Sequence, residues 1–104
     1  MCYRLTGVML ISLMLAVVAA HPTRADVSKG GQLAQQWCAN CHVVRGNPTG
    51  AIPQGPPSFQ TIARSNMTDD QLRAFLSHPH GAMPDLSLTR AEIDDLIGYI
   101  ATLR

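Results

Sequence analysis

Three residues in the first half of the chain combine types and spacing that suit one kind of chemistry. Residues 38–42 read CANCH, with Cys38 and Cys41 three positions apart and His42 directly after the second cysteine. Two thiols at this spacing can form thioether bonds to the two vinyl groups of a haem, and the adjacent histidine can then ligate the iron. Cysteine and histidine are uncommon residues, so chance matches are rare in a chain of 104 residues. The motif predicts one covalently attached haem c.

Other uses of a Cys-x-x-Cys pair fit this chain less well. A thioredoxin-like redox pair would require a βαβ context, and a structural zinc site would require a second pair of ligands at matching spacing. The remaining cysteine is Cys2, and no second paired motif follows residue 42. A disulfide between Cys38 and Cys41 would leave His42 unexplained. Haem attachment is the interpretation that uses all three residues.

An iron bound by His42 on one face needs either a second ligand or an open position on the other. Met83 is the leading candidate, because it precedes a proline in a loop where the backbone can aim a thioether at a fixed point. Two rival ligands are His78 and His80, since bis-histidine ligation is chemically sound. Alternatively, Met83 fills a gap in the core and does not bind the iron. An open or Met67-ligated iron is the remaining alternative.

The beginning of the chain has the pattern of an export signal. An apolar run from Val8 to Ala20 follows a basic residue and is too short for a bilayer-spanning helix. Cleavage after Ala25 is favoured over cleavage after Ala20, and an uncleaved membrane anchor is the alternative. We therefore predict a secretory signal peptide over residues 1–25, one domain over residues 26–104, periplasmic localisation, and no membrane span after cleavage.

The size and charge of the predicted domain limit what it can do. Domains of this length bury only about 60–65% of their unfolded surface, so a large apolar prosthetic group would supply core that the sequence lacks. Residues 26–104 contain nearly equal numbers of basic and acidic side chains, and Lys29 is their only lysine. No basic surface for nucleic acid is predicted.

The sequence predicts an all-α domain, in which helices position the CANCH motif. The predicted helices are Val27–Trp37, Ser58–Arg64, one that begins after Thr68 and ends by His78, and one that begins after Thr89 and ends near Thr102. The last two starts are capping boxes, TDDQ and TRAE. Glycine and proline between residues 43 and 57 exclude a long regular element there.

Apolar stripes indicate which helix faces are buried. In the third predicted helix the stripe comprises Leu72, Phe75 and Leu76, and Phe59 with Ile62 should contribute to the interior from the short second helix. The apolar side of the last helix comprises Ile93, Leu96, Ile97, Ile100 and Leu103.

With these features in place, residues 26–104 resemble a class I c-type cytochrome of the short bacterial mono-haem type. The resemblance is carried by Gly30 and Leu33 ahead of the CANCH motif, by the run GPP at residues 55–57, by Met83-Pro84, and by Leu96 and Tyr99 in the last helix. It implies a small cytochrome c fold of three to four helices around one covalent haem. His42 and Met83 would then be the axial ligands of the iron.

The resemblance also assigns supporting roles. Gly30 would allow the first and last helices to cross closely, with Leu96 and Tyr99 packed at the crossing. A proline carbonyl would accept a hydrogen bond from the second nitrogen of His42, and the choice between Pro56 and Pro57 stays open. Such a bond orients the ring and makes it a better donor. The residues expected to support the haem pocket are Trp37, Pro56, Pro57, Phe59 and Tyr99. Trp37 would lie near the haem edge or serve as an ordinary core aromatic.

These features together predict an exported electron carrier rather than an enzyme. The chain shows no pairing of a base with a nucleophile, and a six-coordinate iron leaves no position for a substrate. Its partners would be a redox protein donor, a redox protein acceptor and the haem-attachment machinery, without nucleic acid. Two alternatives remain: a haem subunit of a periplasmic dehydrogenase, and a haem enzyme or gas sensor with an open distal site.

Overall fold

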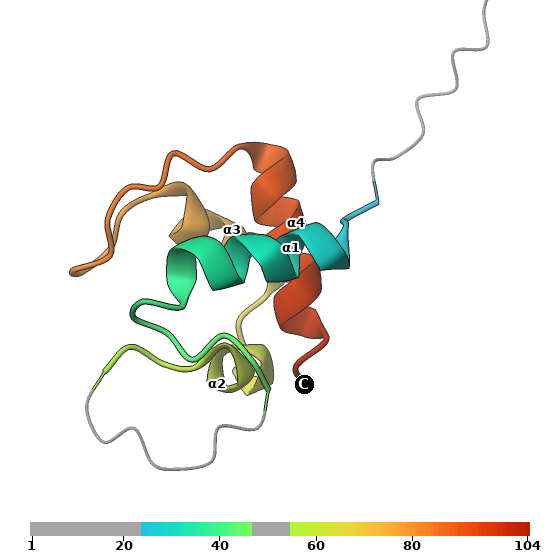
Figure 1. Ribbon diagram of the computed structural model, residues 1–104, viewed down its shortest axis with the longest axis horizontal. Helices are drawn as coiled ribbons and strands as arrows, with labels where there is room; N and C mark the ends of the chain where they lie inside the picture. Colours follow the sequence, from blue (N-terminus) through green and yellow to red (C-terminus); the bar gives the residue numbers. More distant parts are fainter. Residues whose placement is uncertain (1–23, 47–54) are drawn as a thin grey trace, which may run out of the picture.

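The computed structural model describes residues 24–46 and 55–104, which form a helical domain (Figure 1). Its elements are α1 (Val27–Leu33), the π-helix η1 (Ala34–Cys38), α2 (Phe59–Arg64), α3 (Asp69–Ser77) and α4 (Arg90–Ala101). The two described ranges contain no β-strand, so the all-α prediction is confirmed. The predicted signal peptide, except for its last two residues, lies outside the described residues, as does much of the Gly- and Pro-rich loop.

Helices α1 and α4 cross at the centre of the domain, and their backbones touch at Gly30 (Figure 1). A Cβ atom at Gly30 would overlap the carbonyl oxygen of Asp95 and would lie 2.9 Å from the Cβ atom of Tyr99. Only a residue without a side chain fits this crossing. The close approach expected at Gly30 is therefore present.

Side-chain caps fix where three helices begin. The hydroxyl groups of Thr68 and Thr89 accept backbone N–H groups at the starts of α3 and α4, and both capping boxes are complete. Ser58 caps α2 in the same way through the amide of Thr61. Helix α3 ends at Ser77, because the residue before Pro79 is extended rather than helical. These boundaries match the sequence predictions within one residue.

The first helix departs from the expected regular geometry. We predicted one α-helix from Val27 to Trp37, but the second half is the π-helix η1, where the amide of Ala39 donates to the carbonyl of Ala34 at 3.0 Å. A π-turn contains one extra residue, so it rotates the side chains that follow it. As a result, Cys38 is 6% exposed, whereas Trp37 is 52% exposed.

The buried core is built from η1, α2, α4 and Val44, whereas α3 contributes no buried side chain and α1 contributes only Gly30. The buried apolar residues are Ala34, Cys38, Val44, Phe59, Ala63, Ile93, Leu96, Ile97 and Ile100. The prediction of a buried stripe on α3 is wrong for Phe75, which is 50% exposed, and Leu72 and Leu76 are half-buried. Leu72 and Leu76 pack against the core, so the apolar face of α3 is partly covered and Phe75 is its exposed member.

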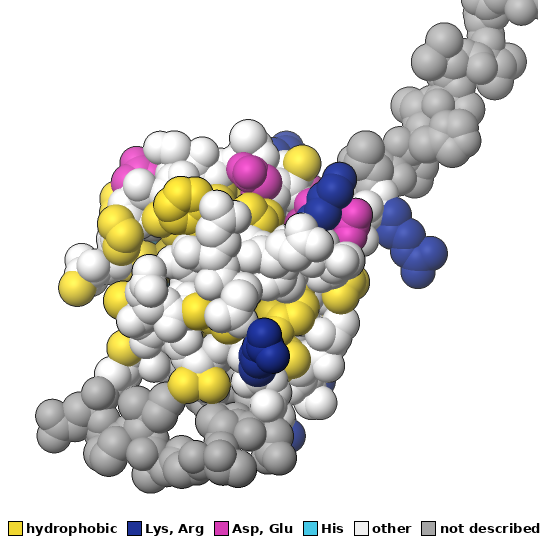
Figure 2. Space-filling model, in the orientation of Figure 1, with side chains coloured by type: hydrophobic (Ala, Val, Ile, Leu, Met, Phe, Trp, Pro, Cys, Tyr) yellow, Lys and Arg dark blue, Asp and Glu magenta, His cyan; other side chains and the backbone are white. Residues whose placement is uncertain are grey.

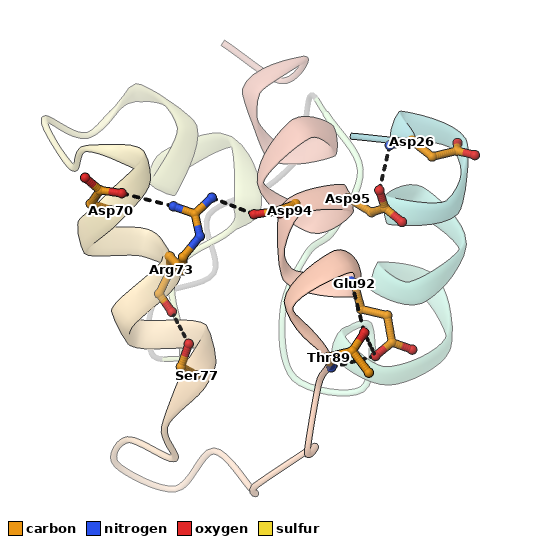
Figure 3. A network of polar contacts seen from close by, with 8 residues as sticks. All are labelled: Asp26, Asp70, Arg73, Ser77, Thr89, Glu92, Asp94 and Asp95. Carbon is orange, nitrogen blue, oxygen red and sulfur yellow. Dashed lines mark hydrogen bonds and ion pairs between the residues drawn. The ribbon is translucent and has the colours of Figure 1, made fainter. Parts of the chain in front are cut away.

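A polar contact joins α3 to α4 (Figure 3). The guanidinium group of Arg73 binds Asp70 at 3.0 Å on its own helix and Asp94 at 2.5 Å on α4. The hydrogen bond to Asp94 is the main reason that the pKa of Arg73 is raised. Arg73 therefore adds a polar attachment between α3 and α4 to the apolar contacts of Leu72 and Leu76.

Candidate haem-binding site

Cys38, Cys41 and His42 lie on one turn at the end of η1. The amides of Cys41 and His42 donate to the carbonyl of Cys38 at 3.1 and 2.9 Å. Both cysteines are free thiols, with Cys38 buried and Cys41 exposed. Burial raises the pKa of the Cys38 thiol, whereas reactive thiols of disulfide exchange have a lowered pKa. With His42 on the same turn, the two thiols and the imidazole suit the attachment of one haem.

One ring nitrogen of His42 is occupied by the loop that follows the motif. Its Nδ1 atom lies 2.7 Å from the carbonyl oxygen of Pro57. A carbonyl can only accept, so Nδ1 carries the proton and the lone pair of Nε2 is free to bind a metal. Of the two prolines that the sequence left open, Pro57 makes this contact.

Aromatic residues hold the ring of His42 and the segment after it. Phe59 is 4% exposed, and its ring centroid lies 5.6 Å from that of His42. The Phe59 amide donates to the carbonyl of Val43 at 2.9 Å. Tyr99 on α4 donates its hydroxyl to the carbonyl of Val44 at 2.7 Å. Helices α2 and α4 thus fix two consecutive peptide groups directly after His42.

These two backbone contacts were not predicted from the sequence. Phe59 and Tyr99 were expected near the site, but their hydrogen-bond partners are peptide groups, which every residue carries. No residue type at positions 43 and 44 therefore signals the contacts. Pro56, the other proline expected near the site, is exposed.

Met83 lies in the segment between α3 and α4, where its side chain is half-buried. Its amide donates to the carbonyl of His80 at 3.0 Å, which closes a turn. The two rival ligands contact the end of α3 instead. Nδ1 of His78 lies 3.3 Å from the carbonyl of Ala74, and Nδ1 of His80 lies 3.0 Å from that of Phe75. Both rings therefore have a structural role as donors to the last carbonyl groups of the helix.

Large apolar side chains remain uncovered on the domain. Trp37 and Phe75 are both about half exposed, so the expectation of Trp37 as a core aromatic is wrong. Figure 2 shows apolar side chains at the surface in the region where Figure 1 draws α3 and the segment after it. Exposed apolar surface of this kind marks a place for a ligand or a partner.

The residues present fit a haem. Two free thiols are available for the vinyl groups, one imidazole nitrogen is free for the iron, and apolar surface is available for the porphyrin. A metal site made only of protein ligands is not an alternative within residues 24–46 and 55–104, because no three His, Cys, Asp or Glu side chains cluster there. In the same ranges no helix has the length and apolar character needed to cross a bilayer.

Comparisons with known proteins identify the family of this chain. The model of the family described as cytochrome c oxidase, cbb3-type, subunit III matches residues 25–100. Cytochrome c-552 of Bradyrhizobium diazoefficiens is 39% identical over 97 residues, which covers 90% of this chain and 92% of that protein. No solved structure matches the chain significantly. The chain belongs to the class I c-type cytochromes and is an electron carrier with covalently bound haem c.

Proposed function

We propose that this cytochrome is an exported mono-haem carrier that passes single electrons between two redox proteins in the periplasm and has no catalytic activity of its own. The carrying observation is the hydrogen bond from His42 Nδ1 to the Pro57 carbonyl, which leaves Nε2 free to face a metal. In this proposal Cys38 and Cys41 form the thioether bonds, and His42 and Met83 are the axial ligands. Attachment requires dedicated machinery in the exporting cell.

The residues around His42 would keep the site unchanged during electron transfer. When bound, the haem iron supplies a one-electron couple between the ferric and ferrous states. Pro57 fixes the orientation of the His42 ring and makes the ring a stronger donor. Phe59 packs against the ring and limits its rotation. A site held in this way needs little rearrangement when the charge changes, which favours fast transfer.

Met83 is supported as the second ligand by its position in the segment between α3 and α4. The Nδ1 atoms of His78 and His80 lie near carbonyl groups at the end of α3, which leaves their Nε2 atoms free as in His42, so both histidines remain the alternatives that the variants below test. Met83 also lies in a turn outside the helices, so its position is set by loop backbone. Thioether ligation would raise the reduction potential above that of bis-histidine iron and close the distal face to substrates.

The spectrum of the purified holoprotein tests the proposal. The ferric protein should show the weak near-infrared band of sulfur-ligated iron, and the ferrous protein should bind carbon monoxide slowly or not at all. Met83→Leu keeps the volume of the side chain but removes the sulfur. This variant should lose the band, become at least partly high-spin, bind carbon monoxide readily and show a lower potential. His78→Gln and His80→Gln are the matched controls and should change none of these properties.

The same variants also identify the alternatives. A Met83 variant with an unchanged spectrum, together with a histidine variant that alters it, would replace His/Met by bis-histidine ligation. If no variant changed the coordination, the distal site would be open. A haem enzyme or gas sensor would then be the better interpretation.

A second candidate function is that of a haem subunit in a larger redox complex. It is favoured by the family description, which names a subunit of an oxidase, and by the exposed side chains of Trp37 and Phe75. Purification from the native membrane and periplasmic fractions would separate the two. A free carrier should elute at the size of a single chain, whereas a subunit should co-purify with its complex.

A further inference from the structure

The start of the domain is bound to an acidic side chain of the last helix. The backbone nitrogen of Asp26 lies 2.6 Å from Asp95 Oδ1, and this partly buried hydrogen bond connects the beginning of α1 to α4 (Figure 3). The Asp26 carboxylate accepts the amide of Lys29 at 3.1 Å and caps α1. The backbone nitrogen of Asp26 thus binds α4, and its side chain caps α1.

We propose that cleavage of the chain between Ala25 and Asp26 creates an ionic latch, in which the new α-ammonium group of Asp26 pairs with the Asp95 carboxylate. The inference rests on the export proposed above and on this cleavage position. Hydrolysis of the Ala25–Asp26 peptide bond consumes one water. The carbonyl carbon of Ala25 becomes a carboxylate, and the nitrogen of Asp26 takes the released proton and becomes an ammonium group.

Cleavage changes the charge of the donor without moving it. In the uncut chain a neutral amide donates to the carboxylate, whereas in the cut chain a cation occupies the same position 2.6 Å away. Hydrogen bonds between ionised partners are roughly twice as strong as neutral ones. A cation at a helix N-terminus is otherwise unfavourable, because the helix dipole is positive there. The carboxylates of Asp26 and Asp95 would offset that repulsion.

The neighbouring charges leave Asp95 as the partner for the new ammonium group. Lys29 Nζ lies 3.9 Å from the Asp26 carboxylate, on α1 itself. Ala25 lines a surface pocket of about 270 Å³ together with Asp69, Arg73 and Asp94, but Arg73 already pairs with Asp94. Within the described part of the chain, the Asp95 carboxylate accepts one hydrogen bond, from the Asp26 nitrogen.

The packing of Ala25 indicates when cleavage occurs. A Cβ atom at Gly98 of α4 would lie 3.0 Å from the Cβ atom of Ala25, so Ala25 lies directly against that helix. A protease needs the bond in an extended and accessible segment. The Ala25–Asp26 bond should therefore be cut before α1 packs on α4. The latch would then form as the processed domain folds.

A double-mutant cycle on the exported holoprotein tests the latch. The four proteins are the wild type, Asp95→Asn, a variant with one glycine inserted between Ala25 and Asp26, and the combination of both changes. The insertion keeps Ala25 before the cleavage point but moves the ammonium group one residue away. At about pH 6.5, Asp95→Asn should raise the unfolding equilibrium constant about tenfold in the wild-type background and less than about threefold in the inserted background.

The pH dependence gives the latch a second signature. The ordinary pKa of an α-amino group is about 7.7–8.0, and pairing with a carboxylate raises it in the folded state. The stabilisation should therefore be complete below about pH 7 and be lost as the pH rises through the folded-state value. The inserted variants should lack this loss. The charged groups around this position are Asp69, Arg73, Asp94 and the Asp26 carboxylate.

Intact mass separates the possible failures. A mature chain that begins at a residue other than Asp26 would overturn the latch. It would not affect the electron-carrier proposal, because the absorbance spectrum of the same samples tests that proposal separately. A chain that begins at Asp26 but shows the same effect of Asp95→Asn in both backgrounds would also overturn it. The contact would then be an ordinary hydrogen bond.

Discussion

At the scale of single residues, the orientation of His42 depends on hydrogen bonds to peptide groups as well as on side-chain packing. Pro57 holds Nδ1, and the next two carbonyl groups are held by the Phe59 amide and the Tyr99 hydroxyl. These contacts come from α2 and α4, which are far apart in the sequence. The imidazole is thus positioned by the fold as a whole.

Removing the Tyr99 hydroxyl should weaken the domain without changing the iron. Tyr99→Phe keeps the ring but leaves the carbonyl of Val44 without its donor, and Val44 is 4% exposed. An unsatisfied buried acceptor costs about 1–2 kcal/mol. Denaturant unfolding of the holoprotein should show this loss of free energy, with an unchanged visible spectrum. Unfolding equal to that of the wild type would mean that water replaces the hydroxyl group.

At the scale of elements, the crossing of α1 and α4 allows no side chain at Gly30. Gly30→Ala would place a Cβ atom 2.6 Å from the carbonyl carbon of Asp95, which is backbone and cannot rotate away. Overpacking of this kind should cost about 2–3 kcal/mol of unfolding free energy, measured by denaturant titration. Gly31→Ala is the matched control on the same helix.

The control should behave differently because its neighbour can move. A Cβ atom at Gly31 would lie 3.2 Å from Cε2 of the Tyr99 ring, which is a side chain. The gain in helix propensity is about 1 kcal/mol, so Gly31→Ala should stay within about 1 kcal/mol of the wild type. Equal effects of the two substitutions would contradict the close crossing at Gly30.

The capping box of α4 should make stability depend on pH. Hydrogen bonds from the Thr89 amide and hydroxyl lower the pKa of Glu92. A lowered pKa stabilises the folded state above the ordinary value of about 4.3, and this contribution is lost as the pH falls through the folded-state value. The stability difference between wild type and Glu92→Gln should therefore shrink in acid. Its measurement is the denaturant midpoint as a function of pH.

The matching box of α3 provides the control. Its third helical position is the neutral Gln71, whose side chain accepts the amide of Thr68 at 2.8 Å. Gln71→Glu should add a pH dependence of the same sign to α3. If Glu92→Gln left the acid dependence of stability unchanged, the Glu92 carboxylate would have no role in the cap.

Local signals explain why the helix boundaries could be predicted. The caps at Thr68 and Thr89 and the break before Pro79 act through nearest neighbours in the sequence, so residue types reveal them. The π-helix η1 has no such signature, because no residue type in this segment marks the one extra residue in its turn. The choice of Pro57 over Pro56 likewise depends on the path of a loop. Sequence spacing therefore identified the motif but not the atom that holds its histidine.

At the scale of the whole molecule, the protein part of the core is incomplete. The buried apolar side chains come from η1, α2, α4 and the segment after His42. The apolar face of α3 has only partial cover, and Trp37 and Phe75 are about half exposed. The sequence periodicity predicts the apolar stripe on α3. It does not predict how much of that stripe the rest of the chain covers, so the exposure of Phe75 could not be predicted. A covalent haem would supply apolar surface where the polypeptide lacks it.

The final prediction is that stable folding requires haem attachment. A domain of this length buries only about 60–65% of its unfolded surface, which leaves little stability without a prosthetic group. A Cys38→Ala, Cys41→Ala double variant should lose covalent haem, so that haem no longer migrates with the polypeptide on a denaturing gel. Its NMR spectrum should show poorly dispersed, broad signals, whereas the holoprotein should give sharp and dispersed ones. Sharp, dispersed signals from the haem-free variant would show that the core formed around Leu96 and Phe59 is sufficient, and that haem serves only electron transfer.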